Sequence, residues 1–525
     1  MLRLAVAEQM RKVDQVAQER FGLSTAVLME NAGLASARVA ARMLPAGGRI
    51  VILAGKGNNG GDGLAAARHL ANWGAKVLVV AAEKNMKGPA ATNLEIIRQM
   101  GLEILEAAPR DNRRIEALLL TADLVIDALL GTGITGPPQG IAADLINSLS
   151  GRTGPILSLD LPSGTNSLGE VFQPHVKASC TVTFGAPKVG TLLYPAAAQT
   201  GKVYLADLGI PQSLIAQECQ AAELLDETIL AKLPPRAPDA HKGKAGRVLL
   251  VAGSEGFTGA AALLAQGALR AGAGLVTLAV PESIYPILAG KLTESMVQKL
   301  PAENQLLGPA SLPRILELAE GMDAVAVGPG LGRGEGPTRL VAGLLAGVNA
   351  PLALDADGLY ALSRLSDKPR REQPLLLTPH SGELARLLAV TSGQVDANRL
   401  SMAQQAASTF NATVVLKGPG TIIAAPGAIP YLNPTGNAAM ASGGMGDLLC
   451  GIIAALLPGL EPRLAAAIGV FVHGLGGDLA ARELGCERGL VARDLLRFIP
   501  GALAGKYPAP RLILPLDEVW KEGKA

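Results

Sequence analysis

Short apolar, β-branched runs alternate with Ala-rich stretches of helical length along the first half of the chain. Strands are expected at Arg49–Ala54, Lys76–Ala81, 124–129 and 156–161, and helices at 64–73 and 93–100. Strands that alternate with helices in this way form a parallel sheet covered by helices. The runs at 124–129 and 156–161 both lead into Asp-containing loops. Open α/β sheets bind ligands at the carboxyl ends of their strands, so chemistry is expected in these loops.

A second series of the same kind begins after residue 244. Between residues 210 and 244 the apolar pattern weakens, and Pro234, Pro235 and Pro238 stand close together. Beyond this segment, strands are expected at 247–252, 275–280, Ala324–Val327, Leu352–Leu354, Leu375–Leu377 and Thr413–Leu416. A chain of 525 residues is also longer than one ordinary domain of about 100–200 residues. The pattern predicts two α/β domains, which we place at residues 1–215 and 225–505.

Composition and charge limit the classes of partner. Hydrophobic residues make up 49% of the chain but aromatic residues only 3%, which suits stacked α/β layers. The net charge is +2 and no Lys/Arg-rich block occurs, so nucleic acid is not expected as a partner. Asp447, Pro458, His473 and Asp478 interrupt the most apolar stretches before they reach about 18 residues, so we expect buried core helices rather than membrane spans.

The cysteines give no sign of a metal site or a disulfide framework. Cys180, Cys219, Cys450 and Cys486 lie far apart and none belongs to a Cys-x-x-Cys pair. Reduced thiols are typical of proteins inside the cell. The N-terminal residues also lack the uninterrupted apolar region of a secretory signal. We therefore expect a cytoplasmic protein.

The segment 437–447 carries the clearest chemical signal. Gly443, Gly444 and Gly446 precede Asp447, and the apolar stretch 448–457 follows. Glycines let the backbone approach a ligand, and the helix expected next would direct its positive end at bound phosphate. Asp447 would then be a base beside an anion site. The alternative is that Asp447 only caps the helix.

A glycine-rich loop also follows the first expected strand. Residues 55–60 match the dinucleotide fingerprint, and Glu83 ends the next strand where a ribose-binding acid is expected. A Rossmann dehydrogenase is therefore one hypothesis. However, Asn58, Asn59 and Asp62 place amides and a carboxylate where a pyrophosphate loop uses backbone alone. Asp62 would repel phosphate, which favours a ligand with hydroxyl groups or a cation.

Two other segments are expected in the same pocket. They are 127–137 and 160–164, and each places a carboxylate at the end of a strand. Asn59, Asp127 and Ser163 supply hard oxygen ligands, too few and too mixed for Mg²⁺ but suitable for a monovalent cation with added backbone carbonyls. Alternatively, these Asp residues only cap loops.

The motifs NNGGDG, DALLGTGITGP and DLPSG, within about residues 10–210, resemble those of the NAD(P)H-hydrate epimerase family, which has a Rossmann-like α/β fold. The resemblance implies that potassium is held by Asn59, Asp127 and Ser163. The hydrated nucleotide would contact Asn58, Asn59, Gly60, Gly61, Asp62, Gly131, Thr132, Gly133, Ile134, Thr135, Gly136, Pro137 and Asp160. The hydrated carbon beside the ring nitrogen is a hemiaminal, whose C–O or ring C–N bond can open and re-form. A carboxylate speeds the proton transfers, and Asp160 is the candidate acid/base, unless it only binds substrate.

Several loops of the second domain suit a nucleotide. Segments 253–260 and 328–332 follow strands and can offer N–H groups to phosphate. Segment 417–421 joins two β-rich runs and is no Walker A loop, because Lys417 precedes the glycines. His380 follows a strand and is either a ligand contact or a structural hydrogen-bonder. Asp355 and Asp357 could orient substrate or cap a helix, and neither is expected to be catalytic.

The ordered motifs GPGLG, TPHSGE, KGPGT and TGNAAMASGGMGD, within about residues 230–499, resemble those of the ADP/ATP-dependent NAD(P)H-hydrate dehydratase family, which has a ribokinase-like fold. The resemblance implies hydrate contacts from Ala260, Gly330 or Gly332, His380 and Asp447. It implies nucleotide contacts from Lys417, Gly418, Pro419, Gly420, Thr421 and Gly446. Asp447 is the candidate catalytic residue, with ADP and Mg²⁺ as co-reactants. The expected substrates are NADHX and NADPHX, the hydrates of NADH and NADPH, and a homo-oligomer is expected.

Two other functions remain open from the residues alone. A ribokinase-like kinase of a vitamin-precursor alcohol would share the Gly-Asp motif but would leave the first domain unexplained. A nucleotide sensor without catalytic activity would bind both ligands without turnover. The identity of the reaction product would separate these alternatives.

Overall fold

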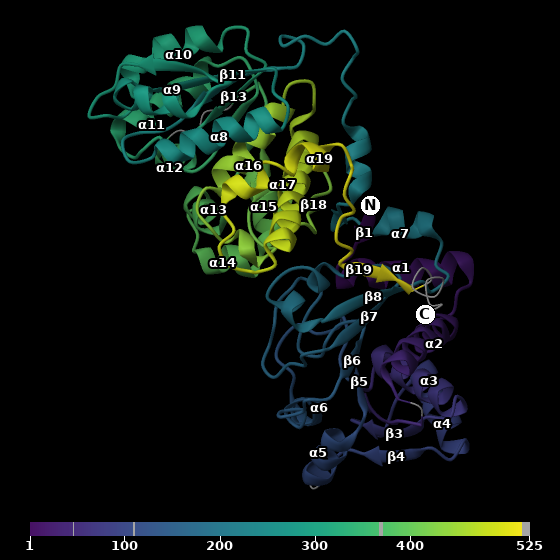
Figure 1. The fold of residues 1–525 in the computed structure, drawn as a ribbon. Helices are drawn as coiled ribbons and strands as arrows, with labels where there is room; N and C mark the ends of the chain where they lie inside the picture. The colour runs from purple at the N-terminus through teal and green to yellow at the C-terminus, as the bar shows by residue number, and fades with distance from the viewer. Residues whose placement is uncertain (46, 109–110, 367–370, 517–525) are drawn as a thin grey trace. The chain divides into compact units, whose positions relative to one another are not determined.

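The computed structural model describes residues 1–45, 47–108, 111–366 and 371–516. Contacts divide the chain into two units (Figure 1). One unit contains residues 2–222 together with the C-terminal segment from Arg511, and the other contains Met1 and residues 223–510. The division falls within the segment where the sequence predicts a boundary. The return of the C-terminal segment to the first unit was not expected.

The first unit is a parallel sheet with helices on both faces. Its strands run in the order β19-β8-β7-β6-β5-β2-β3-β4, and every neighbouring pair is parallel. The strands are β2 (Arg49–Ala54), β3 (Lys76–Ala81), β4 (Glu103–Glu106), β5 (Leu124–Ala128), β6 (Ile156–Leu159), β7 (Cys180–Phe184), β8 (Lys202–Ala206) and β19 (Ile513–Pro515); a short β1 (Leu2–Leu4) precedes them. The helices are α1 (Ala7–Phe21), α2 (Thr25–Met43), α3 (Asn58–Asn72), α4 (Gly88–Gln99), α5 (Asn112–Thr121), α6 (Gly140–Asn147) and α7 (Gln212–Glu218), with short 3₁₀ turns at Val189–Thr191 and Ala196–Gln199.

Alternating residues of the central strands face opposite helical layers. Ile50 and Ile52 of β2 pack in an apolar cluster with residues of α2, α3 and α4. Val51 and Leu53 of the same strand pack in a second cluster with residues of α5 and α6. Both faces of β2 are therefore buried, as expected for a parallel sheet in a three-layer unit.

The second unit contains a longer, mainly parallel sheet. From β9 the order is β9-β18-β17-β16-β15-β14-β13-β10-β11-β12, in which β17 pairs antiparallel with β16 and β18. The strands are β9 (Ala222–Leu224), β10 (Arg247–Val251), β11 (Leu275–Pro281), β12 (Met296–Leu300), β13 (Ala324–Val327), β14 (Leu352–Leu354), β15 (Leu375–Leu377), β16 (Thr413–Leu416), β17 (Ile422–Ala424) and β18 (Tyr431–Leu432).

Along the chain, the helices of the second unit alternate with these strands and continue after β18. They are α8 (Thr258–Arg270), α9 (Tyr285–Lys291), α10 (Leu312–Ala319), α11 (Glu335–Gly347), α12 (Asp357–Arg364), α13 (Ser381–Leu388), α14 (Ser392–Ala397), α15 (Arg399–Phe410), α16 (Met445–Leu456), α17 (Pro462–Leu484), α18 (Ala492–Leu495) and α19 (Ile499–Leu503). Short 3₁₀ turns are at Glu227–Lys232, Glu282–Ile284, Pro309–Ser311 and Ala438–Met440. The expected fold class, two α/β units with mainly parallel sheets, is confirmed.

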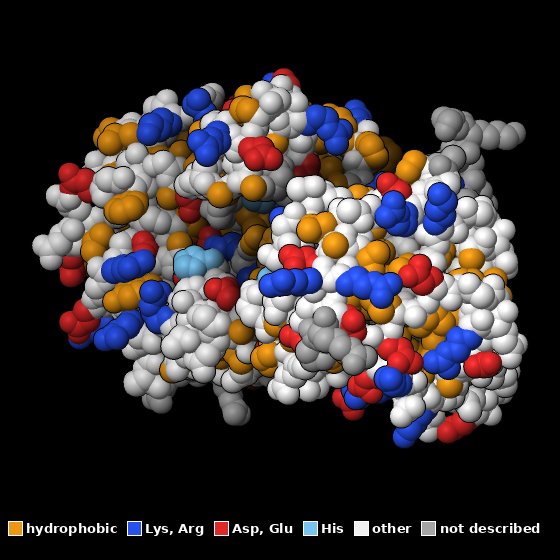
Figure 2. Space-filling model, turned by 90° about the horizontal axis from the view of Figure 1, so that it is seen from below, with side chains coloured by type: hydrophobic (Ala, Val, Ile, Leu, Met, Phe, Trp, Pro, Cys, Tyr) orange, Lys and Arg blue, Asp and Glu red, His pale blue; other side chains and the backbone are white. Residues whose placement is uncertain are grey.

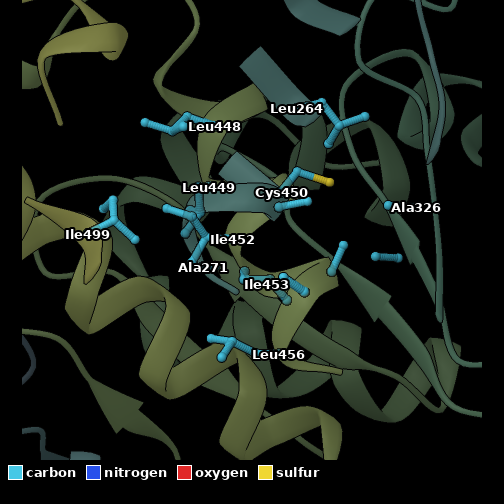
Figure 3. Packing of buried hydrophobic residues seen from close by; sticks show 14 of the residues in the cluster. Leu264, Ala271, Ala326, Leu448, Leu449, Cys450, Ile452, Ile453, Leu456 and Ile499 are labelled. Carbon is cyan, nitrogen blue, oxygen red and sulfur yellow. The ribbon is translucent and has the colours of Figure 1, made fainter. Parts of the chain in front are cut away.

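The core of the second unit is built around α16, which follows the glycine-rich segment. Leu448, Ile452 and Ile453 are fully buried and pack with residues of α8, α17 and α19 (Figure 3). Glycine lets α8 and α16 approach closely, because a Cβ on Gly451 would stand 2.0 Å from the carbonyl oxygen of Leu264. This packing fixes the N-terminal end of α16, where the candidate site lies.

One helix passes a simple test for a membrane span. Helix α17 is long and apolar enough by length and composition, and 78% of its most apolar window is buried inside the structure. Core helices of proteins outside membranes pass the same test, so this observation is weak evidence for a span.

Candidate active sites

A pocket of about 1120 Å³ opens at the carboxyl ends of β2 and β5 in the first unit. The strand order reverses here, because β2 lies between β3 and β5, and such a switch point is where open α/β sheets bind ligands. The expected substrate-binding residues that line the pocket are Asn58, Asn59, Asp62, Gly131, Thr132, Gly133, Ile134, Thr135, Gly136, Pro137 and Asp160. Most of the expected site is thus brought together around one cavity.

Gly60 and Gly61 are not among the residues that line the pocket. The sequence placed them in a loop, but α3 already begins at Asn58, so both lie in its first turn. A Cβ on Gly60 would stand 1.8 Å from the carbonyl oxygen of Gly55, and one on Gly61 would stand 2.5 Å from the methyl carbon of Met29. Close packing of α3 against the loop after β2 and against α2 therefore requires these glycines.

Asp160 is held by a lysine that the sequence motifs did not indicate. Lys188 Nζ lies 2.5 Å from Asp160 Oδ1 and donates to the carbonyl oxygen of Phe184 at 2.9 Å. Both side chains line the pocket, although Lys188 is only 2% exposed. Asp160 also has a φ of 65°, a left-handed conformation that costs a non-glycine residue about 1–3 kcal/mol. Such local strain is typical of functional positions.

Two more carboxylates share the pocket with this pair. Asp62 on α3 is buried, and Asp14 comes from α1. Burial raises the pKa of Asp62 well above its usual value, and the negative charges of Asp160 and Asp14 raise it further. Partial desolvation in the pocket also raises the pKa of Asp14, although this residue is exposed, and Lys188 opposes the rise. The pocket therefore combines an ion-paired carboxylate with a neighbour that favours its protonated form, a pairing suited to acid–base chemistry.

Asp127 lies beneath the pocket in a network of hydrogen bonds. Its Oδ1 accepts from Ser163 Oγ at 2.6 Å, and its Oδ2 accepts from Ser158 Oγ at 2.8 Å and from the Ser163 backbone N–H at 2.9 Å. Asp127 is fully buried, and among the described residues no Lys, Arg or His lies within ion-pair distance of it. Burial raises its pKa despite these hydrogen bonds.

Asn59 adds an unsatisfied oxygen to this region. Its Nδ2 donates to the carbonyl oxygen of Leu130 at 3.0 Å, and that carbonyl also accepts from Ser163 Oγ at 3.3 Å. Asn59 Oδ1 is buried and has no hydrogen-bond partner. A buried carboxylate without a basic partner and an orphaned amide oxygen together fit a bound cation.

In the second unit, the expected nucleotide and hydrate loops all follow adjacent parallel strands. The loops begin after β10, β13, β14, β15 and β16, and their strands are neighbours in the sheet. Gly330 lies against α8, because a Cβ on it would stand 3.2 Å from the Cβ of Ala260. Lys417, which follows β16, comes close to Gly446 at the start of α16. These loops and the end of α16 form one edge of the unit.

Asp447 lies in the first turn of α16 but does not cap it. Gly444 occupies the N-cap position with a φ of 89°, and no side chain makes a capping hydrogen bond. Burial raises the pKa of the Asp447 carboxyl to about 6, and the negative charge of Asp355 adds to the rise, while Lys417 opposes it. The residue is thus prepared to exchange a proton near neutral pH.

Lys417 is held beside Asp447 by two carboxylates. Its Nζ lies 2.6 Å from Asp355 Oδ1 and 3.8 Å from Glu383 Oε2, and the ion pairs raise its pKa against the effect of burial. A Cβ on Gly446 would stand 3.3 Å from this Nζ and 3.7 Å from Asp355 Oδ2. Lys417, Asp355, Glu383 and the start of α16 at Gly446 therefore form one compact group.

Hydrogen bonds from Arg399 hold the start of the expected nucleotide loop, residues 417–421. Arg399 is buried and donates to the carbonyl oxygens of Leu416 and Lys417, at 3.3 Å each. Gly418 and Gly420 adopt φ values of 135° and 63°, which favour glycine, and Thr421 Oγ1 donates to the Gly418 carbonyl at 2.9 Å. Pro419 lies between the two glycines. Their contact with a nucleotide remains a prediction.

His380 has the structural role that was one of its two expected roles, while its contact with a ligand remains a prediction. Its Nδ1 accepts from the backbone N–H groups of Gly382 and Glu383, so it caps α13, while its side chain is 60% exposed. Gly332 donates its backbone N–H to Asp357 Oδ2 at 3.0 Å. Asp357 therefore orders the loop after β13, which no sequence pattern indicated.

Four charged residues of these sites were only partly expected: no role was assigned to Asp14, Lys188 and Glu383, and Asp355 was expected either to orient substrate or to cap a helix. Asp14 and Lys188 belong to no motif and reach the pocket only through the tertiary fold, so no local signal identifies them. Asp355 and Glu383 do follow strands β14 and β15, a position that favours ligand-binding loops. That signal alone does not show their shared contact with Lys417.

Comparison with protein families gives a separate line of evidence. Residues 248–501 match the family model described as NAD(P)H-hydrate dehydratase, and residues 25–190 match the model of the YjeF-related protein N-terminus. The chain is 44% identical over 511 residues to a bifunctional NAD(P)H-hydrate repair enzyme of Moorella thermoacetica, and the match covers 95% of this chain and 96% of that protein.

Solved structures match about half of this chain, at lower sequence identity. An ADP/ATP-dependent NAD(P)H-hydrate dehydratase from Bacillus subtilis, co-crystallised with ATP and Mg²⁺, is 32% identical, covers 55% of this chain and 99% of its own, and has a TM-score of 0.49. A ribokinase-like superfamily protein from Enterococcus faecalis is 27% identical, covers 55% of this chain and 98% of its own, and has a TM-score of 0.48.

Proposed function

The chain belongs to the family of bifunctional NAD(P)H-hydrate repair enzymes, and we propose from this that it restores damaged nicotinamide nucleotides with two active sites. The first unit interconverts the R and S epimers of NADHX and NADPHX. The second unit dehydrates the S epimer to NADH or NADPH at the expense of ADP, which yields AMP and phosphate. We assign the epimerase to residues 1–215 and the dehydratase to residues 225–505.

The environment of Asp447 is the observation that carries the dehydratase assignment. The residue makes no capping hydrogen bond, follows a glycine turn, and has a pKa raised to about 6. A carboxylate with such a pKa is an effective general base near neutral pH. The N–H groups at the start of α16 and the charge of Lys417 lie beside it, where they can stabilise negative charge on phosphate.

The proposed reaction activates a poor leaving group. Asp447 removes the proton of the hydrate's hydroxyl, whose oxygen attacks the terminal phosphorus of ADP and displaces AMP. The ring nitrogen's lone pair then helps to expel phosphate, and loss of a ring proton restores the dihydropyridine. In the proposed site, Ala260, Gly330, Gly332 and His380 contact the hydrate, while residues 417–421 and Gly446 contact the nucleotide.

Mg²⁺ is proposed to enter with the nucleotide rather than to occupy a preformed protein site. Among the described residues, no group of three His, Cys, Asp or Glu side chains is placed to hold a metal ion. Mg²⁺ commonly binds through one or two carboxylates and substrate phosphates, and Asp355, Glu383 and Asp447 are the nearby carboxylates. When bound, it neutralises charge on the transferred phosphoryl group.

In the first unit, Asp160 is proposed as the acid/base for epimerisation, with the hydrate lying along the pocket. Lys188 forms an ion pair with Asp160 and orients it, and the raised pKa of Asp62 favours the protonated form of that carboxyl. Asn59, Asp127 and Ser163 are proposed to hold potassium, which fits the orphaned Asn59 oxygen and the Asp127 carboxylate without a basic partner. The ion would compensate the buried charge beneath the substrate.

One chain with both activities can repair the whole hydrate pool. A stereospecific dehydratase leaves one epimer unused unless another activity interconverts the two. The proposed partners are the small molecules NADHX, NADPHX and ADP. We also propose a cytoplasmic homo-oligomer that binds neither nucleic acid nor membrane. Acidic and basic side chains are interspersed on the face shown in Figure 2, which suits the absence of a nucleic-acid surface.

The test is incubation of the purified protein with mixed NADHX epimers, ADP and Mg²⁺, with each epimer and NADH followed by chromatography. We expect both epimers to disappear, Asp447→Asn to block NADH formation alone, and Asp160→Asn to slow only the loss of the R epimer. Near-normal turnover by Asp447→Asn would contradict the assignment. Accumulation of a stable phosphorylated compound would instead indicate a kinase.

A further inference from the structure

Two arginines and a tyrosine form a cationic group that the proposed mechanism does not use. The guanidinium carbon of Arg333 lies 4.8 Å from the ring centroid of Tyr360, and that of Arg386 lies 5.5 Å from the same centroid. Arg333 belongs to the loop after β13, Tyr360 to α12 and Arg386 to α13. We call these three residues the arginine platform. Three chain segments thus converge to place two cations against one aromatic ring.

The platform is connected to both sides of the proposed hydrate site. Asp357 accepts from Arg333 Nε at 3.0 Å through Oδ1 and from the Gly332 N–H at 3.0 Å through Oδ2. Arg386 lies on the helix that His380 caps. Gly332 and His380 are both proposed hydrate contacts: Gly332 is linked to Arg333 through Asp357, and His380 caps the helix that carries Arg386.

Both arginines keep hydrogen-bonding capacity that the described part of the chain does not use. The terminal nitrogens of Arg333 and the whole guanidinium of Arg386 make no hydrogen bond there, and Arg386 has no ion pair. The Arg333 side chain is 61% exposed. By contrast, the buried Arg399 donates from Nη2 to two backbone carbonyls and from Nη1 to Ser381 Oγ. Two arginines against the single carboxylate of Asp357 leave the platform positive.

We propose that Arg333 and Arg386, stacked on Tyr360, bind a phosphate group of the hydrated dinucleotide at the dehydratase site. This inference rests on the proposed function. The planar guanidinium group binds phosphate through paired N–H groups, and stacking on tyrosine holds that plane in place. Both substrates carry a pyrophosphate and NADPHX also carries a 2′-phosphate, so the same chemistry has two possible sources.

The test is the steady-state kinetics of dehydration by Arg333→Ala, Arg386→Ala and the double variant, at saturating ADP. We expect KM for the hydrate to rise about 10- to 150-fold, as for the loss of one charge-assisted hydrogen bond, with a smaller change in kcat. A rise for NADPHX alone identifies the 2′-phosphate, and a rise for both substrates identifies the pyrophosphate. A KM within twofold of the unmodified protein's value for both substrates would overturn the proposal.

A matched control separates this effect from a general loss of surface charge. Arg339 is 67% exposed on α11 and is paired with Glu335 rather than stacked on a ring. Arg339→Ala is expected to leave both KM values unchanged, and an equal rise in that variant would count against the platform.

A binding measurement makes the outcome independent of turnover. Calorimetric titration with NADP⁺ and NAD⁺ should show the same loss of affinity in Arg333→Ala and Arg386→Ala. Suppose that the unmodified protein does not consume the hydrates but binds NADP⁺ more tightly than the two variants do. The proposed function then fails while the phosphate site stands. If hydrates are consumed and neither variant changes affinity or KM, only the phosphate site fails.

Discussion

At the scale of single residues, both proposed sites combine a carboxylate with a lysine. Asp160 is paired with Lys188, and Lys417 lies between Asp355 and Glu383 beside Asp447. In each site another carboxylate, Asp62 or Asp447, has a raised pKa because it is buried near like charges. In the proposed mechanisms, proton transfer in both units therefore depends on where the fold buries charge.

The pH dependence of dehydration should report Asp447. A general base must be ionised, so kcat/KM should fall as the pH drops below about 6, the value to which burial and Asp355 raise its pKa. Asp355→Asn removes one cause of that rise, so the acidic limb should move to lower pH. ADP also titrates near this pH, and comparison of the two proteins in the same buffers cancels that contribution. A limb that moves upward or stays in place would contradict the role of Asp355.

Removal of Lys188 should impair epimerisation. Lys188→Met leaves Asp160 with no ion-pair partner in a pocket that already contains Asp14 and Asp62, and breaking a buried ion pair commonly costs about 3–5 kcal/mol. We expect epimer interconversion to slow at least tenfold, as followed by chromatography without ADP. Lys188→Arg retains the charge and should recover part of the rate. Equal loss in both variants would indicate that shape, rather than charge, limits the reaction.

At the scale of helices and strands, apolar patterning predicted the sheets well. The expected strands at Arg49–Ala54, Lys76–Ala81, Ala324–Val327 and Thr413–Leu416 have the observed bounds, because buried parallel strands are short apolar runs. The start of α3 was placed six residues too late, at 64 instead of 58. Asn and Gly favour turns locally, but close packing at Gly60 and Gly61 makes the helix extend through them.

The candidate sites were predictable to the extent that their residues lie in strand-end loops. The pocket-lining residues Asn58, Asn59 and Asp62 and the segment 131–137 carry local signals, as does Asp447 after three glycines. Lys188, Asp14 and the arginine platform depend on contacts between distant segments. Spacing along the chain does not encode such contacts, so they became visible only in the fold.

The contact between α8 and α16 should depend on glycine. A Cβ on Gly451 would stand 2.0 Å from a backbone oxygen of Leu264, which cannot move without a shift of α8. Gly451→Ala should therefore lower the free energy of unfolding by about 1–3 kcal/mol, although alanine favours a helix over glycine by about 1 kcal/mol. Gly290 of α9 has no neighbour within 4 Å, so Gly290→Ala should be neutral or stabilising. Chemical denaturation of both variants checks this, and an unchanged Gly451→Ala protein would contradict it.

At the scale of the whole molecule, each unit places its site at the carboxyl edge of a parallel sheet, beside a reversal of strand order. In the first unit β2 and β5 flank the reversal, and in the second β10 and β13 do. The same principle therefore builds two sites for one substrate. The proposed chemistry differs because the loops differ: one set surrounds Asp62, Asp160 and the proposed cation site, and the other surrounds Lys417 and Asp447.

The C-terminal segment gives the first unit a dependence on residues that follow the second unit in sequence. Strand β19 pairs in parallel with β8 (Figure 1). Ile513 and Leu516 are only 4% and 5% exposed. Loss of a buried Ile or Leu side chain commonly costs about 2–5 kcal/mol. The double variant Ile513→Ala, Leu516→Ala should therefore destabilise residues 2–222 while residues 223–510 keep their stability.

Hydrogen exchange followed by mass spectrometry should show faster exchange in peptides of the first unit alone, and epimerisation should be lost at a lower temperature than dehydration. Leu512 is 42% exposed, so Leu512→Ala is the matched control and should leave exchange unchanged. Equal acceleration in both units would show that the C-terminal segment stabilises the chain as a whole, whereas acceleration confined to the first unit would make β19 part of the epimerase unit.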